Sequence, residues 1–325
     1  MTVELSARFK PHLDLIEQHL LNCASPELPV SLREPIRYFL SMPGKKIRPL
    51  LALSACEVVG GNSRDALSAA TAIELFHDFT LIHDDIMDQD ELRRGYRTMH
   101  VEYDESTAIL VGDAMIGMAY RYLIQSPRPY FESVVGIFTE ALVKVCEGQA
   151  LDKEFEKRSE VSLEAYLDMI GKKTAWLLKI ACSIGATCGG ANAEQVQLLS
   201  EFGDCLGLGF QIQDDLLDFV ADQSKLGKQV GSDFRMDKKT YVALKYREIL
   251  RENPALQEQY PLHIPDYPTF TDFQKALYEL GIVEAVQGVA DQYIRRALDA
   301  LQQVAPLDDH NPLFAITRFL QQRQY

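Results

Sequence analysis

The sequence has little of what several common classes of protein need. Its 325 residues carry 33 lysines and arginines against 47 aspartates and glutamates, so the net charge of −14 argues against general nucleic-acid binding. No uncharged apolar run reaches the roughly twenty residues of a membrane-spanning helix, because Lys179 interrupts the best candidate at 175–190. The first residues contain Glu4 and no apolar core segment, which predicts no secretory signal. We therefore expect a cytoplasmic protein that is not integral to a membrane.

The sequence also shows no pattern of cysteine chemistry. None of its six cysteines forms a C-x-x-C pair, and no His/Cys array has the spacing of a zinc site. There is no Ser/His/Asp or Cys/His signature of a covalent nucleophile either. In a chain this long, scattered cysteines are expected as buried small apolar residues in a reducing compartment.

Helical periodicity dominates the sequence. Apolar residues recur at spacings of three and four over five long segments, and alternating strand patterns are nearly absent. These segments are 11–22, 71–88, 105–124, 132–156 and 194–220. Turn residues mark breaks at 23–29, 42–46, 126–130 and 188–193, and four prolines between 254 and 268 indicate a surface excursion. The sequence therefore predicts one all-α domain over residues 1–325.

Two aspartate clusters share one spacing, "HDDIMD" at 83–88 and "QDDLLD" at 213–218. Residues four apart lie on one helix face, where like charges destabilise a bare helix. A single D-D-x-x-D is more often a solvated helix face than a site, but two copies arise by chance in fewer than about one such chain in a hundred. Magnesium would compensate the charge, because it prefers one or two carboxylates together with phosphate oxygens and water.

Basic residues occur in short stretches next to glycine, proline or hydroxyl side chains. The stretches are "PGKKIRP" (43–49), "LRRG" (92–95), "GKKTAW" (171–176), "LGKQVG" (226–231) and "MDKKT" (236–240). Arginine offers forked donors to phosphate and lysine a compact charge. Each stretch alone is more often a solvated surface, but together with two carboxylate clusters they suit two polyphosphates, one held by magnesium and one held directly.

In these motifs and their order, the chain resembles the trans-isoprenyl diphosphate synthases, which make farnesyl, geranylgeranyl and longer polyprenyl diphosphates. The resemblance runs from about residue 43 to 240 and includes "EGQALD" (147–152) and "GFQIQDDLLDF" (209–219). It implies the isoprenoid synthase fold, a single large helical bundle around a deep central active-site cavity, and a homodimer. It also implies a magnesium-dependent head-to-tail condensation of isopentenyl diphosphate with dimethylallyl, geranyl or farnesyl diphosphate, with about three magnesium ions per active site.

The resemblance implies a role for each matching position. The metal ligands would be Asp84, Asp88 and Asp214, supported by Asp85, Asp152, Asp215 and Asp218. The allylic diphosphate would contact Arg93, Gln149, Lys173, Thr174, Gln211, Lys228 and Lys238, and isopentenyl diphosphate would contact Lys45, Arg48, His77, Arg94 and Phe210. Catalysis would rest on Asp84, Asp85, Asp88, Asp214, Lys173 and Lys228. One position departs from the family pattern, since Asp237 stands directly before Lys238 where glycine is frequent.

The length of the product would depend on Phe76, Phe79 and Thr80, which precede the first aspartate cluster. Phe79 is a bulky residue five positions before Asp84, and in this the chain resembles the members of the family that make geranylgeranyl or farnesyl diphosphate. The alternative for these aromatics is that they only pack the core. The alternative for the function is a synthase of longer polyprenyl diphosphates. Two further alternatives are a terpene cyclase, which has no need of the isopentenyl diphosphate residues, and a non-catalytic subunit of a heteromeric synthase, which typically loses one aspartate motif.

Overall fold

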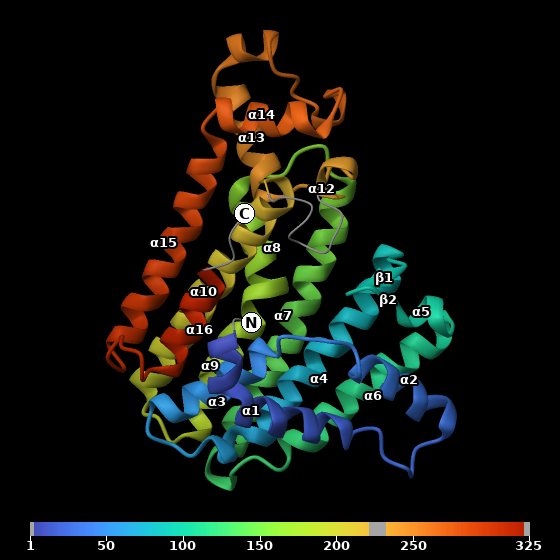
Figure 1. The fold of residues 1–325 in the computed structure, drawn as a ribbon, viewed down its shortest axis with the longest axis vertical. Helices are drawn as coiled ribbons and strands as arrows, with labels where there is room; N and C mark the ends of the chain where they lie inside the picture. The colour runs from blue at the N-terminus through green and yellow to red at the C-terminus, as the bar shows by residue number, and fades with distance from the viewer. Residues whose placement is uncertain (1–2, 221–231, 322–325) are drawn as a thin grey trace. The chain divides into compact units, whose positions relative to one another are not determined.

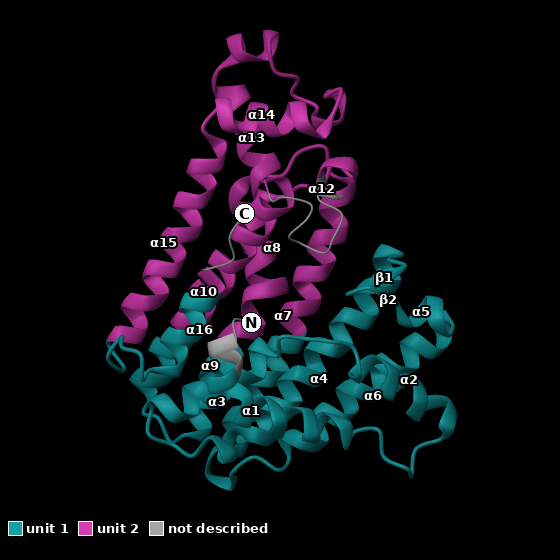
Figure 2. Ribbon diagram, viewed as in Figure 1, with its two compact units in different colours: residues 1–142, 180–200, 303–319 teal, residues 143–179, 201–302, 320–325 magenta. Residues whose placement is uncertain are grey.

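The computed structural model describes residues 3–220 and 232–321, which form helices and a single short hairpin (Figure 1). The all-α prediction is confirmed. The chain divides into two compact units, shown in Figure 2: unit 1 is residues 1–142, 180–200 and 303–319, and unit 2 is residues 143–179, 201–302 and 320–325. The single domain with a central cavity stays a prediction.

Unit 1 is built around one long central helix. Its elements are α1 (Val3–Leu21), α2 (Val30–Leu40), α3 (Ile47–Val58), α4 (Ser63–Asp88), β1 (Leu92–Arg93), β2 (Tyr96–Arg97), α5 (Met99–Glu102), α6 (Glu105–Leu123) and η1 (Arg128–Tyr130). Parts of α7 (Phe131–Lys157), α9 (Trp176–Cys188), α10 (Ala193–Val220) and α16 (Pro312–Gln321) complete it. Helix α4 packs against α3 and α6 and is buried around most of its circumference, which many alanines between 66 and 72 allow.

Unit 2 holds its own hydrophobic core. It adds to the remaining parts of α7, α9 and α10 the elements α8 (Leu163–Ile170), η2 (Gly171–Ala175), α12 (Ser232–Arg235), α13 (Tyr241–Glu252), η3 (Pro254–Glu258), η4 (Ile264–Asp266), α14 (Phe270–Glu279) and α15 (Ile282–Gln302). Phe273 is fully buried, with its ring centroid 5.7 Å from that of Phe219 and 5.2 Å from that of Tyr246. The proline-rich stretch 254–268 contains only short 3-10 turns, as its composition indicates.

The first helix differs from the sequence prediction, which starts it at residue 11. Helix α1 begins at Val3 and contains Pro11. Its N-terminal turns are held in place because Phe9 is buried and because the Arg8 guanidinium donates to the carbonyl oxygens of Asp309, at 2.6 Å, and His310, at 2.8 Å. Contacts with residues distant in the sequence therefore stabilise the helical turns before Pro11, although a proline is more often found at the start of a helix.

Within residues 3–220 and 232–321, no single helix is long and apolar enough to cross a membrane. The segments Glu105–Leu123 and Arg128–Lys157, taken together, do meet this criterion of length and apolar composition, but the pair is bent by 116°.

The close packing of α9 on α3 within unit 1 gives a first testable prediction. A Cβ on Gly185 would lie 2.0 Å from the carbonyl oxygen of Ala52, a backbone atom that cannot move independently. We expect Gly185→Ala to lower the free energy of unfolding by about 3 kcal/mol or more through overpacking. Gly288→Ala is the matched control, since Gly288 lies in α15 with no atom near its Cβ position, and should stabilise by about 0.5–1 kcal/mol. Urea denaturation of both variants checks the pair, and equal stability would contradict it.

Candidate active site

The first aspartate cluster occupies the C-terminal end of α4. Asp84 is half-buried, Asp85 is 1% exposed and Asp88, the last residue of the helix, is exposed. Successive residues of a helix point about 100° apart, so Asp84 and Asp88 share a face from which Asp85 turns away. The three carboxylates therefore have different surroundings despite their adjacency.

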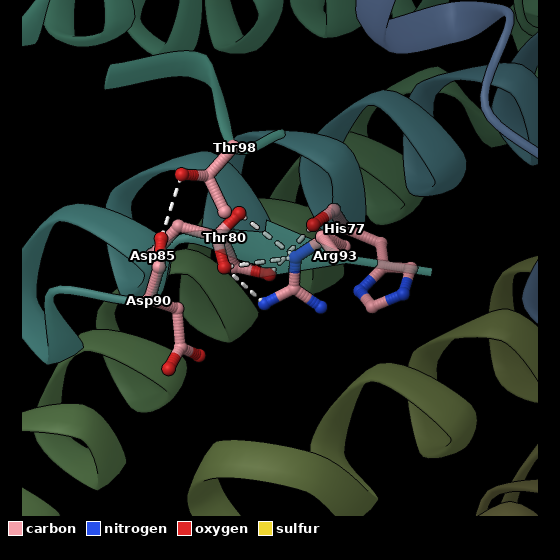
Figure 3. A network of polar contacts seen from close by, with 6 residues as sticks. All are labelled: His77, Thr80, Asp85, Asp90, Arg93 and Thr98. Atoms are coloured by element: carbon pink, nitrogen blue, oxygen red, sulfur yellow. Dashed lines mark hydrogen bonds and ion pairs between the residues drawn. The ribbon is translucent and has the colours of Figure 1, made fainter. Parts of the chain in front are cut away.

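A tight hairpin explains what Asp85 contacts. Arg94 and Gly95, the two turn residues between β1 and β2, both have positive φ, 54° and 83°, as a type I′ turn requires. The hairpin places the Arg93 side chain next to the end of α4. The Nε atom of Arg93 lies 2.9 and 2.8 Å from the two carboxylate oxygens of Asp85 (Figure 3). Burial raises the pKa of Asp85, and the Arg93 guanidinium opposes that rise. Asp85 therefore serves to hold Arg93 beside the other two carboxylates.

Among the residues predicted for isopentenyl diphosphate that lie in unit 1, Arg48 of α3 and His77 of α4 are brought together, whereas Lys45 lies in the loop before α3 and Arg94 in the hairpin turn. Arg48 Nη1 lies 2.9 Å from His77 Nε2. Burial first, and then the Arg48 charge, lower the pKa of His77 well below its usual value. The imidazole is therefore neutral, and since arginine can only donate, Nε2 accepts and Nδ1 carries the hydrogen. Arg94 is exposed and donates from Nη1 to the carbonyl oxygen of Pro43 at 2.8 Å, close to the exposed Lys45.

The three residues predicted to limit product length lie on successive turns of α4. Phe76 is fully buried, and its ring centroid is 5.1 Å from that of Phe138 in α7. Phe79 and Thr80 are half-buried, and the Phe79 ring meets the His83 ring edge-on at 4.7 Å. Phe76 is thus a core residue that supports Phe79, whereas Phe79 and Thr80 are partly accessible.

In unit 2, a chain of hydrogen bonds surrounds the second aspartate cluster. Thr174 Oγ1 donates to Gln211 Oε1 at 3.1 Å, and Gln211 Nε2 donates to Asp215 Oδ1 at 3.0 Å. The other oxygen of Asp215 accepts from the hydroxyl of Tyr166 and from the backbone N–H of Tyr241, at 3.1 Å. Burial raises the pKa of Asp215 to about 6, and these donors oppose the rise. Asp215 is buried, whereas Asp214 is exposed and Asp218 is half-buried.

Lys173 and Thr174 lie in η2, a π-helical turn between α8 and α9. Such turns are frequent at functional sites because they redirect side chains within a helix. Lys173 Nζ donates to Asp152 Oδ2 at 2.6 Å. Gly148 makes the approach possible, because a Cβ there would lie 2.3 Å from the backbone nitrogen of Lys173. The glycine of "EGQALD" therefore positions the lysine of "GKKTAW".

The remaining predicted residues of unit 2 lie on the same elements or near them. Gln149 is 8% exposed, and neither amide atom has a hydrogen-bond partner among the described residues. Phe210 is half-buried on α10, and Lys238 is exposed and close enough to Asp215 to lower its pKa. Lys228 lies outside the described residues.

The structure accounts for the departure at Asp237. Its φ is 47°, the left-handed conformation that glycine adopts most easily and that aspartate tolerates better than most residues. Its carboxylate accepts a hydrogen bond from Arg247, which holds the turn. The backbone conformation before Lys238 is therefore one that a glycine would also adopt.

The two aspartate pairs share one arrangement, each within its own unit. The second aspartate of each pair, Asp85 or Asp215, is buried and hydrogen-bonded internally, whereas the first, Asp84 or Asp214, is more exposed. Within the described ranges, no group of three His, Cys, Asp or Glu side chains could alone hold a metal ion. Sparse carboxylates fit magnesium, which takes its remaining ligands from phosphate and water.

Sequence reasoning missed three charged residues of unit 1. Lys46, Glu74 and Asp78 are 8%, 4% and 2% exposed. The available signal was two carboxylates four residues apart inside the apolar stretch "AIELFHDF" (72–79), which a packed helix tolerates only with a partner.

Comparison with known proteins adds independent findings. A family model described as "Polyprenyl synthetase" matches residues 29–264. The chain is 36% identical over 324 residues to a protein of Methanothermobacter thermautotrophicus named short chain isoprenyl diphosphate synthase, with 99% of this chain and 100% of that protein covered. It is 38% identical over 306 residues to the geranylgeranyl diphosphate synthase of Sulfolobus acidocaldarius, with 91% and 90% covered. The crystal structure of geranylgeranyl pyrophosphate synthetase from Pyrococcus horikoshii superimposes with a TM-score of 0.89 at 34% identity, covering 99% of both chains.

Proposed function

We propose, because this chain belongs to the polyprenyl synthetase family, that it condenses isopentenyl diphosphate with an allylic diphosphate in a magnesium-dependent reaction. As a member of this family it is a prenyltransferase, and the resemblance to trans-isoprenyl diphosphate synthases is confirmed. The observation that carries the proposal is the common arrangement of the two aspartate pairs. In each pair, one carboxylate accepts hydrogen bonds from donors within the protein and the other is more exposed. The exposed carboxylate is therefore available to bind a metal ion that in turn binds a diphosphate.

The chain's own residues would divide the work between two diphosphates. Lys45, Arg48 and Arg94 would hold isopentenyl diphosphate, with neutral His77 orienting the Arg48 guanidinium. Arg93, Gln149, Lys173, Thr174, Gln211, Lys228 and Lys238 would face the allylic diphosphate. Asp85 and Asp152 would orient Arg93 and Lys173, and Asp215 would orient Gln211. Fixed cations of this kind stabilise the negative charge that develops on a departing diphosphate.

Magnesium would be held by Asp84, Asp88 and Asp214, and when bound it would shield the allylic diphosphate and so make it a better leaving group. The allylic C–O bond then breaks, the double bond of isopentenyl diphosphate attacks, and a bond forms between its C4 and the allylic C1. A proton is lost in the last step, for which the departing diphosphate is a sufficient base. Apolar side chains would exclude water from the allylic cation, and Phe210 would lie beside the isopentenyl group.

We propose geranylgeranyl diphosphate as the product, with farnesyl diphosphate as the shorter alternative. The names of the Sulfolobus and Pyrococcus proteins support this length. Phe79, which is half-buried and backed by His83 and Phe76, is the residue placed to stop the growing chain.

Replacing Phe79 should therefore lengthen the product. Phe79→Ala removes the partly accessible ring, and we expect the main product to gain at least one isoprene unit while turnover stays within about tenfold. Chromatography of the dephosphorylated products with labelled isopentenyl diphosphate measures the change. Phe138→Leu is the matched control, because Phe138 is fully buried and its ring packs behind Phe76 and against Tyr120. An unchanged product length for Phe79→Ala would assign Phe79 to core packing.

The protein is further proposed to act in the cytoplasm as a homodimer. Ile109 and Leu110 on α6 are 41% and 61% exposed, and a second copy that covers them would remove apolar surface from water.

Incubation of the purified protein with labelled isopentenyl diphosphate, each allylic primer and magnesium tests the proposed function. Elongated diphosphates are the expected result, and chelation of magnesium should abolish them. A released hydrocarbon or alcohol would indicate a terpene cyclase, and absence of turnover would indicate a non-catalytic subunit.

A further inference from the structure

A buried ion pair joins the loop before α3 to the middle of α4. Lys46 Nζ lies 3.0 Å from Glu74 Oε1, and the two side chains are 7% and 5% exposed. Burial alone would lower the pKa of Lys46, but the charges of Glu74 and Asp78 outweigh it and raise the pKa. Lys46 is therefore a charged group that has no access to a substrate, although it stands between two residues proposed to bind one.

The backbone at Lys46 has a conformation that lysine does not favour. Its φ is 48° and its ψ is 39°, in the left-handed region, and it is the N-cap of α3 without a side-chain capping bond. A non-glycine residue persists in this conformation only when its surroundings hold it there. The ion pair with Glu74 is the polar contact that the Lys46 side chain makes with α4.

The turn at Lys46 decides where its neighbours point. Lys45 is exposed and Lys46 is buried, so the chain directs consecutive lysines in different directions. Two residues later, Arg48 meets His77, which is three positions after Glu74 and hence on the same side of α4. A second close approach lies on the other side of the turn, where a Cβ on Gly44 would be 2.8 Å from Arg94 Nη1.

Asp78 is a second carboxylate near Lys46, but the ion pair of Lys46 is with Glu74. Asp78 lies one turn after Glu74 and is 2% exposed, and its Oδ2 has no hydrogen-bond partner among the described residues. Burial raises the pKa of Asp78, although the charges of Lys46, Arg94 and Arg48 oppose that rise. The direct contact at 3.0 Å makes Glu74 the carboxylate that pairs with Lys46.

We propose that Glu74 is a positioning residue for isopentenyl diphosphate, because its carboxylate holds Lys46 in the left-handed conformation that presents Lys45 and Arg48 to that substrate. The inference rests on the proposed function, since it assumes that this loop binds one of the two diphosphates. It assigns a role in substrate binding to a residue that contacts no substrate.

The effect should appear in one Michaelis constant and not in the other. Glu74→Gln removes the charge that holds Lys46, and we expect KM for isopentenyl diphosphate to rise about tenfold or more, because small misplacements of binding groups are costly. KM for the allylic primer should stay within about twofold. Glu57→Gln is the matched control: the carboxylate of Glu57, at the other end of α3, also has a side-chain hydrogen-bond partner, His12 at 2.8 Å.

A double variant separates positioning from stability. Lys46→Met with Glu74→Leu removes both charges and leaves neither buried alone, so its melting temperature should approach that of the wild type. If the inference holds, its KM for isopentenyl diphosphate stays raised despite the recovered stability. A wild-type KM in the double variant would overturn the positioning role, and the double variant decides the matter if Glu74→Gln does not fold.

Failure of the proposed function is recognised separately. A wild-type protein without turnover would overturn the proposed function, and the role of Glu74 would then be measured as the affinity for inorganic diphosphate by titration calorimetry. Weaker binding by Glu74→Gln and by the double variant supports the role, and unchanged binding by both overturns it.

Discussion

Replacing Asp84 by asparagine is expected to lower kcat about 10²- to 10³-fold, the effect typical of removing one group that stabilises charge in a transition state. The amide keeps the size of the side chain but loses the anionic oxygen that magnesium prefers. Because Asp84 is only half-buried at the end of α4, the melting temperature should change little. Steady-state turnover measured across magnesium concentrations checks the prediction, and the magnesium concentration for half-maximal rate should rise.

Asp90→Asn is the matched control for this experiment. Asp90 is exposed just beyond α4, and the interaction that ties it to the hairpin uses its carbonyl oxygen, which accepts from Thr98 Oγ1 at 2.6 Å. Its substitution should leave turnover within about twofold. If Asp84→Asn and Asp90→Asn had the same activity, the carboxylate of Asp84 would not be a metal ligand and the proposed arrangement would be wrong.

The helices were predictable from the sequence where hydrophobic period and punctuation agree. The predicted segments 105–124, 132–156 and 194–220 match α6, α7 and α10 to within one residue at each end. Capping explains part of this agreement, since Asp104 accepts from the backbone N–H of Thr107 at the start of α6. The family and the prenyltransferase activity were also predictable, because they depend on motifs that lie in a fixed order along the chain.

The local geometry of the site was less predictable because it depends on backbone conformations that single residues do not reveal. The spacing of Asp85 and Arg93 does not show that a turn with positive φ at Arg94 and Gly95 brings them into contact. Likewise, "PGKKIRP" does not show which of its two lysines is buried. The roles of the site residues toward substrates and magnesium stay predictions.

The buried carboxylate of Asp78 should make the stability of the protein depend on pH. Burial raises its pKa to about 7; Lys46, Arg94 and Arg48 oppose that rise, and Glu74 adds to it. The buried Cys23 thiol lies near enough for Asp78 to raise its pKa. Since the folded pKa exceeds the unfolded value of 3.8, the stability that Asp78 contributes is fully present below that value and is lost as the pH rises through about 7.

Asp78→Asn removes this titration. Between about pH 5.5 and about pH 8.5 the wild type should lose about 2 kcal/mol that the variant does not lose, a difference that follows from the two pKa values. Urea denaturation of both proteins at the two pH values measures it, with Asp14→Asn as control, because the ion pair of Asp14 with Lys10 is exposed. A pH-independent difference between wild type and Asp78→Asn would mean that Asp78 stays ionised when buried. Lys46 would then be shared by two carboxylates, and Glu74 would lose its distinct role.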